Sequence, residues 1–388
     1  MPATTTFLRT TAFAVLFPAA ALAQSDVPEA DRFETERGAI AVETLVTGLS
    51  HPWAVEDMGD GGLLVTERPG RLRIFRDGQL SEPVEGVPEV AARGQGGLLD
   101  VALSKDFADS RILFLSYSKP GDGGAGTAIM RARLSDDGGR LEEAEDIFQM
   151  NRFTNSGHHF GSRIVVADDG TLFFTIGERG EGERAQDPGD HAGSVLRINA
   201  DGTIPEDNPH ADGSDGWQPE IWSIGHRNPQ GADIDPETGT FYAVEHGAKG
   251  GDELNIPEAG KNYGWPEISY GVHYSGAKIG QGTAAEGYEQ PLHYWDPSIA
   301  PGGMAVYRGD QFPEWDGDIL VTALKFQLLV RLDVDPETGN VTGEERLLEN
   351  RYGRMRDVKV ASDGSVLIVT DEDDGRLLRL TRNGENTD

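Results

Sequence analysis

A unit of short apolar strands and tight turns recurs six times along the 388 residues, and this repetition predicts an all-β, six-bladed β-propeller. The composition agrees, because 51 glycines and 21 prolines supply the turns that many short strands need. No stretch longer than a turn or two shows the period of an amphipathic helix. Hydrophobic residues make up 37% of the chain, which is too many for a disordered protein.

In several repeats an Asp-Gly or similar pair stands between two strands, as a hairpin requires. Asp169-Gly170 and Asp363-Gly364 are equivalent examples. The strands expected in the six repeats are residues 53–55, 63–65 and 72–75; 99–103 and 112–115; 163–166, 171–174 and 195–198; 231–234 and 241–244; 303–306, 319–321 and 329–332; and 357–360, 366–369 and 377–380. A strand at residues 39–46 is expected to join the last blade and close the ring. Long loops are expected to build a site over the central channel.

The first 23 residues are typical of a secretory signal peptide. Arg9 precedes an apolar run at residues 12–23, which ends in a small-x-small cleavage sequence at residues 21–23. The run is too short for a membrane-spanning helix, although an uncleaved anchor is the alternative. We therefore expect a periplasmic protein without a membrane span. Residues 24–38 are expected to be poorly ordered and residues 39–388 to form one catalytic domain.

Charge and cysteine content exclude several classes of function. The chain has 66 acidic and 34 basic residues, and a formal charge of −32 disfavours binding to nucleic acid or anionic membranes. It has no cysteine, so disulfides, thiolate ligands and cysteine nucleophiles are excluded. Basic residues that cluster in so acidic a chain are therefore candidates for binding an anion.

Three glycine-rich segments carry polar residues that a scaffold would not need. Gln95 lies among glycines that let a ligand approach the backbone closely. His159 stands before a predicted inner strand as a candidate general base. Arg227 and Asn228 offer a cation and an amide to ligand oxygens. Taken singly, each segment could also be a surface turn or a structural hydrogen-bonding group.

A fourth segment, residues 245–255 with residues 262–266, offers the carboxylate and carbonyl oxygens that calcium prefers. A solvated acidic turn is the alternative. Two later clusters are basic, and their members are Lys325, Arg351, Arg354 and Arg356. Arg354 and Arg356 alternate, so a strand would direct both to one face, where they suit a small polyanion. Pairing with the acidic surface is the alternative.

Together these segments resemble the soluble pyrroloquinoline quinone (PQQ) dependent aldose sugar dehydrogenases, relatives of soluble glucose dehydrogenase. The resemblance extends from about Gly48 to Leu380. The segments that carry it are residues 94–98, 159–163, 225–231, 251–255 with 262–266, 297–301 and 354–357. Each is weak alone, but their order along one chain is specific.

The resemblance implies a PQQ-dependent, calcium-assisted oxidation of aldoses at the anomeric carbon to lactones, with hydride passing to the quinone. It implies that His159 takes the proton of the anomeric hydroxyl and that Arg227 stabilises charge on the quinone oxygen. The residues implied to bind or border the cofactor are Gln95, Arg227, Asn228, Tyr274, Lys325, Phe326, Gln327, Arg354, Met355 and Arg356. One calcium would be held by the carbonyls of Gly247 and Ala248. A second, structural calcium would use the Glu253 carboxylate and the Tyr263 carbonyl.

Two positions depart from soluble glucose dehydrogenase at the border of its sugar pocket. Glu178 stands where that enzyme has Asp, and Asp296 stands where it has Trp. These differences favour the broader aldose dehydrogenase branch. The expected partners are an aldose substrate and a periplasmic electron acceptor, with the protein a monomer or a homodimer.

Two other functions are compatible with a propeller. A calcium-dependent lactonase or esterase would use calcium and a histidine, but it would not need cations such as Lys325 and Arg356 at the channel. A non-catalytic carbohydrate-binding propeller would not need His159, Arg227 and Gln95 together.

Overall fold

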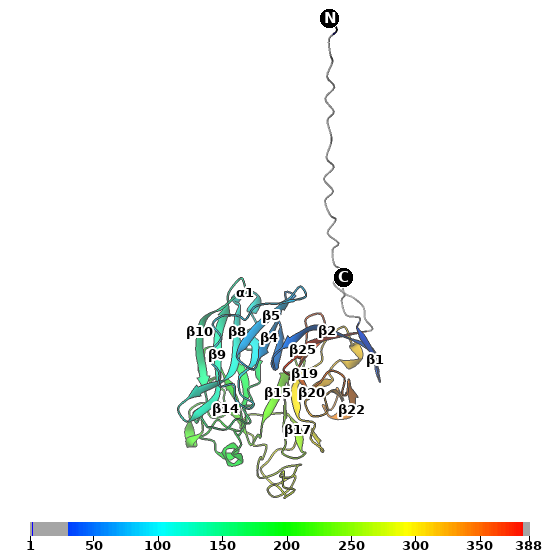
Figure 1. The fold of residues 1–388 in the computed structure, drawn as a ribbon. Coiled ribbons are helices and arrows are strands. Elements are labelled where there is room, and N and C mark those ends of the chain that lie inside the picture. Colours follow the sequence, from blue (N-terminus) through cyan, green and yellow to red (C-terminus); the bar gives the residue numbers. More distant parts are fainter. Residues whose placement is uncertain (1, 3–29, 383–388) are drawn as a thin grey trace.

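The computed structural model, which describes residues 2 and 30–382, confirms the all-β, six-bladed β-propeller. Six antiparallel sheets, five of four strands and one of five, follow one another around a ring in chain order (Figure 1). Within the described residues, no helix has the length and apolar character needed to cross a membrane. The predicted signal peptide, apart from residue 2, lies outside the described residues.

Each blade is one consecutive antiparallel sheet, apart from the last. Blade 1 consists of β3 (Pro52–Asp57), β4 (Leu63–Glu67), β5 (Arg71–Arg76) and β6 (Gln79–Leu80). Blade 2 consists of β7 (Leu98–Leu103), β8 (Ile112–Gly121), β9 (Gly124–Leu134) and β10 (Leu141–Gln149). Blade 3 consists of β11 (Ile164–Val166), β12 (Leu172–Ile176), β13 (Ser194–Ile198) and β14 (Ile221–Ile224).

The remaining blades complete the ring. Blade 4 consists of β15 (Pro229–Ile234), β16 (Phe241–Glu245), β17 (Asp252–Asn255) and β18 (His293–Trp295). Blade 5 consists of β19 (Pro301–Val306), β20 (Ile319–Ala323), β21 (Leu328–Val334) and β22 (Val341–Leu347). Blade 6 consists of β23 (Met355–Val360), β24 (Val366–Thr370), β25 (Gly375–Arg382), β2 (Gly38–Leu49) and β1 (Asp31–Thr35). The short helices are α1 (Phe107–Ser110), η1 (Gly182–Gln186), η2 (Ser214–Gly216) and η3 (Pro313–Trp315).

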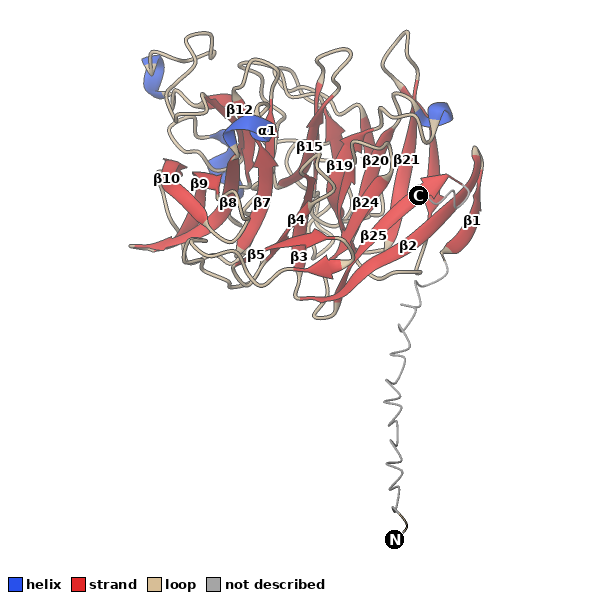
Figure 2. Cartoon of the chain, turned by 90° about the horizontal axis from the view of Figure 1, so that it is seen from above, coloured by secondary structure: helices blue, strands red, loops and turns tan. Residues whose placement is uncertain are grey.

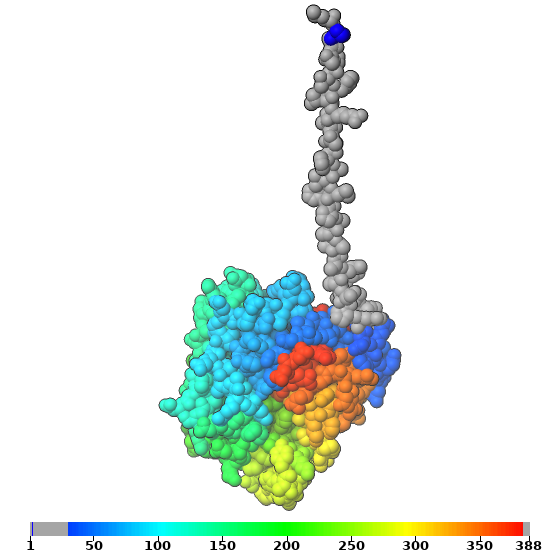
Figure 3. Space-filling view, in the orientation of Figure 1, coloured from blue at the N-terminus to red at the C-terminus, as the bar shows by residue number. Residues whose placement is uncertain are grey.

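The two ends of the described chain meet in blade 6, as predicted. β2 pairs antiparallel with β25, placing Val42 opposite Leu380. Figure 2 shows β2 alongside β25 with β1 outermost, and in Figure 3 the blue and red ends of the chain are in contact. Such closure leaves no gap between the first and last blades.

The prediction that residues 24–38 are poorly ordered is wrong for residues 31–35, which form β1. Phe33 pairs with Ile40 of β2 and packs edge-on against Tyr352, with 6.2 Å between ring centroids. The Tyr352 hydroxyl donates to the Asp31 carboxylate at 2.8 Å. Residues 31–35 therefore form a hairpin with the adjacent β2 and also contact Tyr352, which is more than 300 residues away in sequence.

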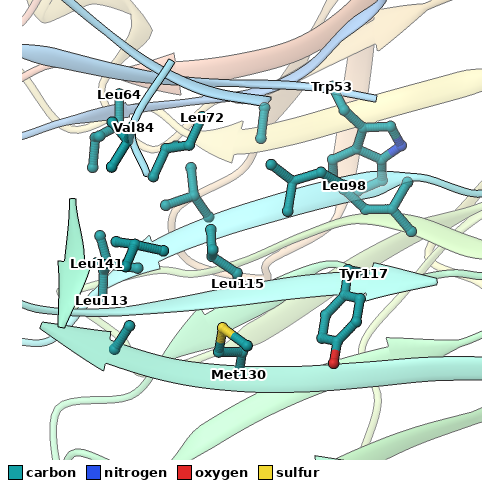
Figure 4. Packing of buried hydrophobic residues seen from close by; sticks show 14 of the residues in the cluster. Trp53, Leu64, Leu72, Val84, Leu98, Leu113, Leu115, Tyr117, Met130 and Leu141 are labelled. Atoms are coloured by element: carbon teal, nitrogen blue, oxygen red, sulfur yellow. The ribbon is translucent and has the colours of Figure 1, made fainter. Parts of the chain in front are cut away.

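The hydrophobic core lies between neighbouring blades, because a single sheet is too thin to bury its own apolar faces. Between blades 1 and 2, Leu64 and Leu72 of one blade pack with Leu98 and Leu115 of the next (Figure 4). All four side chains are fully buried. This packing holds the inner strands of adjacent blades at a fixed separation around the channel.

The inner strands also carry a buried charge network that joins distant blades. Arg163 donates to Asp100 of β7 at 2.8 Å and to Asp357 of β23 at 2.7 Å. Lys359 of β23 pairs with Glu56 of β3 at 2.8 Å. Burial raises the pKa of Asp100 above its ordinary value, although Arg163 opposes the rise. Arg163, which belongs to one of the segments that carried the family resemblance, therefore has a structural contact set that ties blades 2, 3 and 6 together.

Replacing Arg163 with methionine is expected to lower the free energy of unfolding by about 3–5 kcal/mol, because Asp100 and Asp357 would lose their buried cation. Urea denaturation followed by tryptophan fluorescence measures the change. The matched control is Lys105→Met, which breaks an exposed pair with Asp168 and should cost less than about 1 kcal/mol. Equal losses of unfolding free energy in the two variants would contradict a stabilising role of Arg163 between the blades.

Candidate active site

Hydrogen bonds bring the glycine-rich segments of the sequence together. The Gln95 side chain accepts a hydrogen bond from the His159 amide at 2.7 Å, and the Asn228 side chain accepts one from the Gly161 amide at 3.1 Å. The Glu178 amide donates to the Arg227 carbonyl at 3.0 Å. The segments predicted to form a site on blades 2, 3 and 4 therefore lie in one place.

His159 is arranged as a general base. Its Nδ1 forms a hydrogen bond with the Glu178 carboxylate, whereas Nε2 has no hydrogen-bond partner among the described residues. Because a carboxylate accepts, Nδ1 carries the proton in the neutral ring and Nε2 presents a lone pair. The side chain is 14% exposed, and this burial lowers the pKa of His159 against the opposing effect of Glu178.

Several contacts hold the backbone and side chain of Arg227 in place. Its amide donates to Glu245 at 2.6 Å, and its Nη1 donates to the carbonyls of His246 at 3.1 Å and of Gly247. The guanidinium carbon lies 5.2 Å from the ring centroid of Trp265. Its buried Nε has no partner in the described part of the chain. One donor of a fixed, buried cation is thus left over.

Arg356 is a second buried cation with a spare donor. Both of its terminal nitrogens donate to the Gln230 side chain at 2.9 Å, and its guanidinium lies 4.7 Å from the Trp53 ring centroid. Within the described residues, no carboxylate lies at ion-pairing distance, and the Nε has no partner. Burial lowers the pKa of Arg356 to about 10. In a chain of charge −32, buried arginines without a carboxylate partner suit a site for an anionic ligand.

A neighbouring cavity of about 450 Å³ is lined by several of the predicted residues. These are Gly247, Ala248, Tyr274 and Lys325, together with His246 and Asp296. Tyr274 is 76% exposed at the rim. The ammonium of Lys325 lies 5.0 Å from the Phe326 ring centroid and has no carboxylate partner among residues 30–382. The cavity therefore offers a third cation without a carboxylate partner.

Arg354 differs from Arg356 in being more exposed and in having a carboxylate nearby. Its side chain is 45% exposed and lies 3.7 Å from the Asp371 carboxylate. Gln327 is in a left-handed turn at φ 52° between β20 and β21, and its carbonyl accepts from the Asn350 amide at 2.9 Å. Phe326 packs partly against the core of blades 4 and 5.

Two basic-run residues do not join the site. Met355 was expected to border the cofactor, but its side chain is fully buried in the hydrophobic cluster of blades 5 and 6. On a strand, neighbouring residues face opposite sides, so the orientation of Arg356 toward the channel directs Met355 into the core. Arg351 lies against Phe33, 5.6 Å from its ring centroid, at the outer edge of blade 6.

The predicted calcium residues fit a cation, though not through a cluster of acidic side chains: within residues 30–382 no group of three or more His, Asp or Glu is arranged to hold a metal ion. Glu253 lies opposite Glu245 across β16 and β17, and Asn255 Nδ2 donates to both carboxylates at 3.2 and 3.0 Å. Burial and the charge of Glu245 raise the pKa of Glu253. Two neighbouring carboxylates that repel each other suit a bound divalent cation. Tyr263 is next to this pair in the fold, because it stacks on His226, which bonds Glu245 at 2.9 Å.

The Gly247 and Ala248 loop is fixed from below by Asp252. One oxygen of this buried carboxylate accepts from the Gly247 amide at 2.8 Å, and the other accepts from the amides of Ile299 and Ala300 at 2.8 Å. Gly247 and Ala248 line the cavity wall, and the Gly247 carbonyl also accepts from Arg227. Carbonyl oxygens of this kind are suitable calcium ligands.

Several contact-making residues were not assigned a role from the sequence. Glu178 bonds His159, and Gln230 joins Arg356 to His246, whose Nε2 lies 3.0 Å from the Gln230 side chain. A repeat-level signal for Glu178 does exist, because an acidic residue stands at or just after the end of the second strand in four blades. These residues are Glu67, Glu178, Glu245 and Asp371.

Comparisons with known proteins identify the family of the chain. A family model described as glucose/sorbosone dehydrogenase matches residues 49–379. The chain is 44% identical over 347 residues to the aldose sugar dehydrogenase YliI of Escherichia coli (strain K12), covering 88% of this chain and 93% of that protein.

Solved structures give the same result. The apo-form crystal structure of the soluble aldose sugar dehydrogenase of Escherichia coli matches with a TM-score of 0.86 and 43% identity, covering 89% of this chain and 100% of that one. The PQQ-bound aldose sugar dehydrogenase of Streptomyces coelicolor matches with a TM-score of 0.72 and 27% identity, covering 88% of this chain and 98% of that one. The chain belongs to the glucose/sorbosone dehydrogenase family and is an oxidoreductase.

Proposed function

We propose that this protein oxidises aldose sugars at the anomeric carbon to lactones, with PQQ as cofactor and with calcium. The observation that carries the proposal is a set of three cations near His159 that have no carboxylate partner within residues 30–382. They are Arg227, Arg356 and Lys325. PQQ is a small planar molecule with three carboxylates, and a relative in the same family is PQQ-bound. A lactonase or esterase would have no use for these cations.

The residues present define how the protein would act on the substrate. Bound PQQ would supply an electron-accepting quinone for the hydride of the anomeric carbon. His159 Nε2 would take the proton of the anomeric hydroxyl, and Glu178 would stabilise the resulting imidazolium through Nδ1. Arg227 would present its guanidinium to the growing negative charge, an arrangement that requires no reorganisation because the side chain is already fixed.

The remaining polar groups would bind and orient the cofactor. Arg356 and Lys325 would pair with its carboxylates, Arg354 would add a more exposed charge, and Gln95 and Asn228 would offer amides. Tyr274, Phe326 and Gln327 would border the pocket. The Gly247 and Ala248 carbonyls would hold one calcium, and Glu253 with the Tyr263 carbonyl a second. We further propose a periplasmic location, a periplasmic electron acceptor and a monomeric or homodimeric state.

Reconstitution tests the proposal. The full chain, expressed in a host that exports it and purified free of metal and cofactor, is mixed with PQQ, with calcium, with both and with neither. Dye reduction is measured with hexoses, pentoses and disaccharides, and lactone is identified by mass spectrometry. Activity is expected only when both are added, because neither the electron acceptor nor the polarising cation is a side chain of the protein.

Three outcomes would count against the proposal or part of it. Failure to bind PQQ would remove the cofactor assignment, and hydrolysis of a lactone or ester in calcium alone would favour the lactonase alternative. Tight PQQ binding without oxidation of any aldose would keep the cofactor but exclude this substrate class.

A further inference from the structure

Arg179 is a fully buried arginine without a carboxylate partner in the described chain. Its guanidinium stacks over the Phe160 ring at 3.5 Å from the centroid, and its Nε has no hydrogen-bond partner in residues 30–382. A buried, unpaired charge is costly to fold, and here burial lowers the pKa of Arg179 to about 10. The hydrogen bonds that Arg179 does make must therefore compensate for this cost.

Both terminal nitrogens of Arg179 donate to backbone carbonyls just before His159. Nη2 donates to the Ser156 carbonyl at 2.7 Å, and Nη1 donates to the His158 carbonyl. The carbonyl between them, that of Gly157, accepts from the Gln95 amide at 2.8 Å. All three carbonyls that precede the candidate base are thus fixed, two of them by Arg179.

This restraint matters because His159 has a left-handed backbone, with φ 54°. A residue with a side chain pays about 1–3 kcal/mol for such a conformation and keeps it only where its surroundings enforce it. In this left-handed conformation the imidazole contacts Glu178, whose carboxylate also accepts from the Gly180 amide at 3.1 Å. Arg179 itself has φ 64°, which turns its side chain back under the 156–158 segment.

We propose that Arg179 is a positioning residue: its two carbonyl contacts hold His159 in the left-handed conformation that sets its Nδ1–Glu178 hydrogen bond and leaves Nε2 directed at the substrate. The proposal rests on the proposed role of His159 as base. The planar guanidinium of Arg179 donates to two carbonyls at once while it stacks on Phe160. A lysine ammonium is a compact point charge and could not make both contacts in this geometry. Phe160 in turn packs close to Gly96, so the clamp extends to the Gln95 loop.

The first test is independent of catalysis and of PQQ. In cofactor-free protein, ¹⁵N NMR of the histidine rings reports which nitrogen of His159 carries the proton. The wild type is expected to show the Nδ1–H form, and Arg179→Gln is expected to show a mixture of both forms because the Glu178 contact is no longer enforced. Arg184→Gln is the matched control. Arg184 is another buried arginine of the same loop, but it pairs with Asp190 at 2.7 Å and does not contact the His159 segment.

The second test separates positioning from binding. Arg179→Gln is expected to lower kcat by about 10–100-fold with the KM for aldose and the affinity for PQQ changed less than about threefold, because misplacing a base affects the chemical step. Arg179→Lys, which keeps a cation and is the safer variant for folding, is expected to fall between the wild type and Arg179→Gln. Arg184→Gln should lower the melting temperature without this selective loss of kcat.

A wild-type Nδ1–H signal retained in both Arg179 variants, with kcat losses no larger than in Arg184→Gln, would overturn the proposal. If the enzyme oxidised no aldose under any condition, the proposed function would fail while the NMR comparison would still decide whether Arg179 sets the state of His159.

Discussion

His159→Ala is expected to lower kcat for aldose oxidation by about 10²–10⁴-fold while leaving PQQ affinity within a few-fold of the wild type. The loss is large because Nε2 is the free ring nitrogen of a histidine whose other nitrogen is committed to Glu178. The other nearby histidine, His246, cannot substitute, since its Nε2 is engaged by Gln230. Stopped-flow reduction of the bound cofactor in a single turnover measures the chemical step directly.

The matched control is His158→Ala. His158 is exposed, its ring centroid lies 6.1 Å from that of His159, and its backbone carbonyl, which Arg179 binds, survives the substitution. This variant should keep kcat within a few-fold. A comparable loss in both variants, or no loss in His159→Ala, would exclude His159 as the base.

The same assignment predicts the direction of a pH dependence. Burial holds the pKa of His159 below its ordinary value of 6.5, and only the neutral ring can accept a proton. The rate kcat/KM should therefore rise with pH through a midpoint below 6.5 and be on its plateau at neutral pH. Glu178→Gln, which removes the charge that opposes this lowering, should move the midpoint to still lower pH and reduce kcat.

The fold could be predicted from the sequence because its information is local and repeated. Five of the six blades are built from strands that are consecutive in the chain, and the apolar strand pattern recurs six times, with Asp-Gly or similar pairs at hairpin turns in several of the repeats. Ring closure followed from the one strand left over at residues 39–46, which β2 confirms. β1 forms a hairpin with β2, but it was missed because Phe33 is its only apolar residue, and the ring against which Phe33 packs, Tyr352, belongs to the opposite end of the chain.

The site was predictable where residue type alone is unusual. A histidine and a glutamine among glycines, or arginines in an acidic chain, are visible in a list of residues. Roles that depend on which group a side chain reaches are not visible there: Arg179 binds backbone carbonyls, and Gln230 binds the Arg356 side chain. The basic run shows it too. Arg351, Met355 and Arg356 are near neighbours in sequence, yet they lie against Phe33, in the core and at the channel, respectively.

Arg356→Met is expected to weaken PQQ binding by about 30-fold or more, since removing one partner of a buried charge pair costs about 2–5 kcal/mol. The structure shows why this cation should matter most: it is buried, it has no protein carboxylate at pairing distance in the described chain, and Gln230 and Trp53 fix its plane. Titration of PQQ into the calcium-loaded protein, followed by quenching of tryptophan fluorescence, gives the affinity. Arg351→Met is the matched control, because it removes an arginine of the same run that lies against Phe33, and its PQQ affinity should equal that of the wild type.

A second measurement on the same variant separates a ligand site from a structural arginine. If Arg356 is retained for an anionic ligand, then without PQQ it is an uncompensated buried cation, and replacing it with an apolar side chain of similar length should leave the melting temperature unchanged or raise it. Arg163→Met should do the opposite, because Arg163 is neutralised by Asp100 and Asp357, although both arginines flank Trp53 at 4.7 and 4.6 Å. A large loss of stability in cofactor-free Arg356→Met with unchanged PQQ affinity would make this arginine part of the scaffold. Weaker PQQ binding at undiminished stability would instead show that the protein maintains a buried positive charge for the sake of its cofactor.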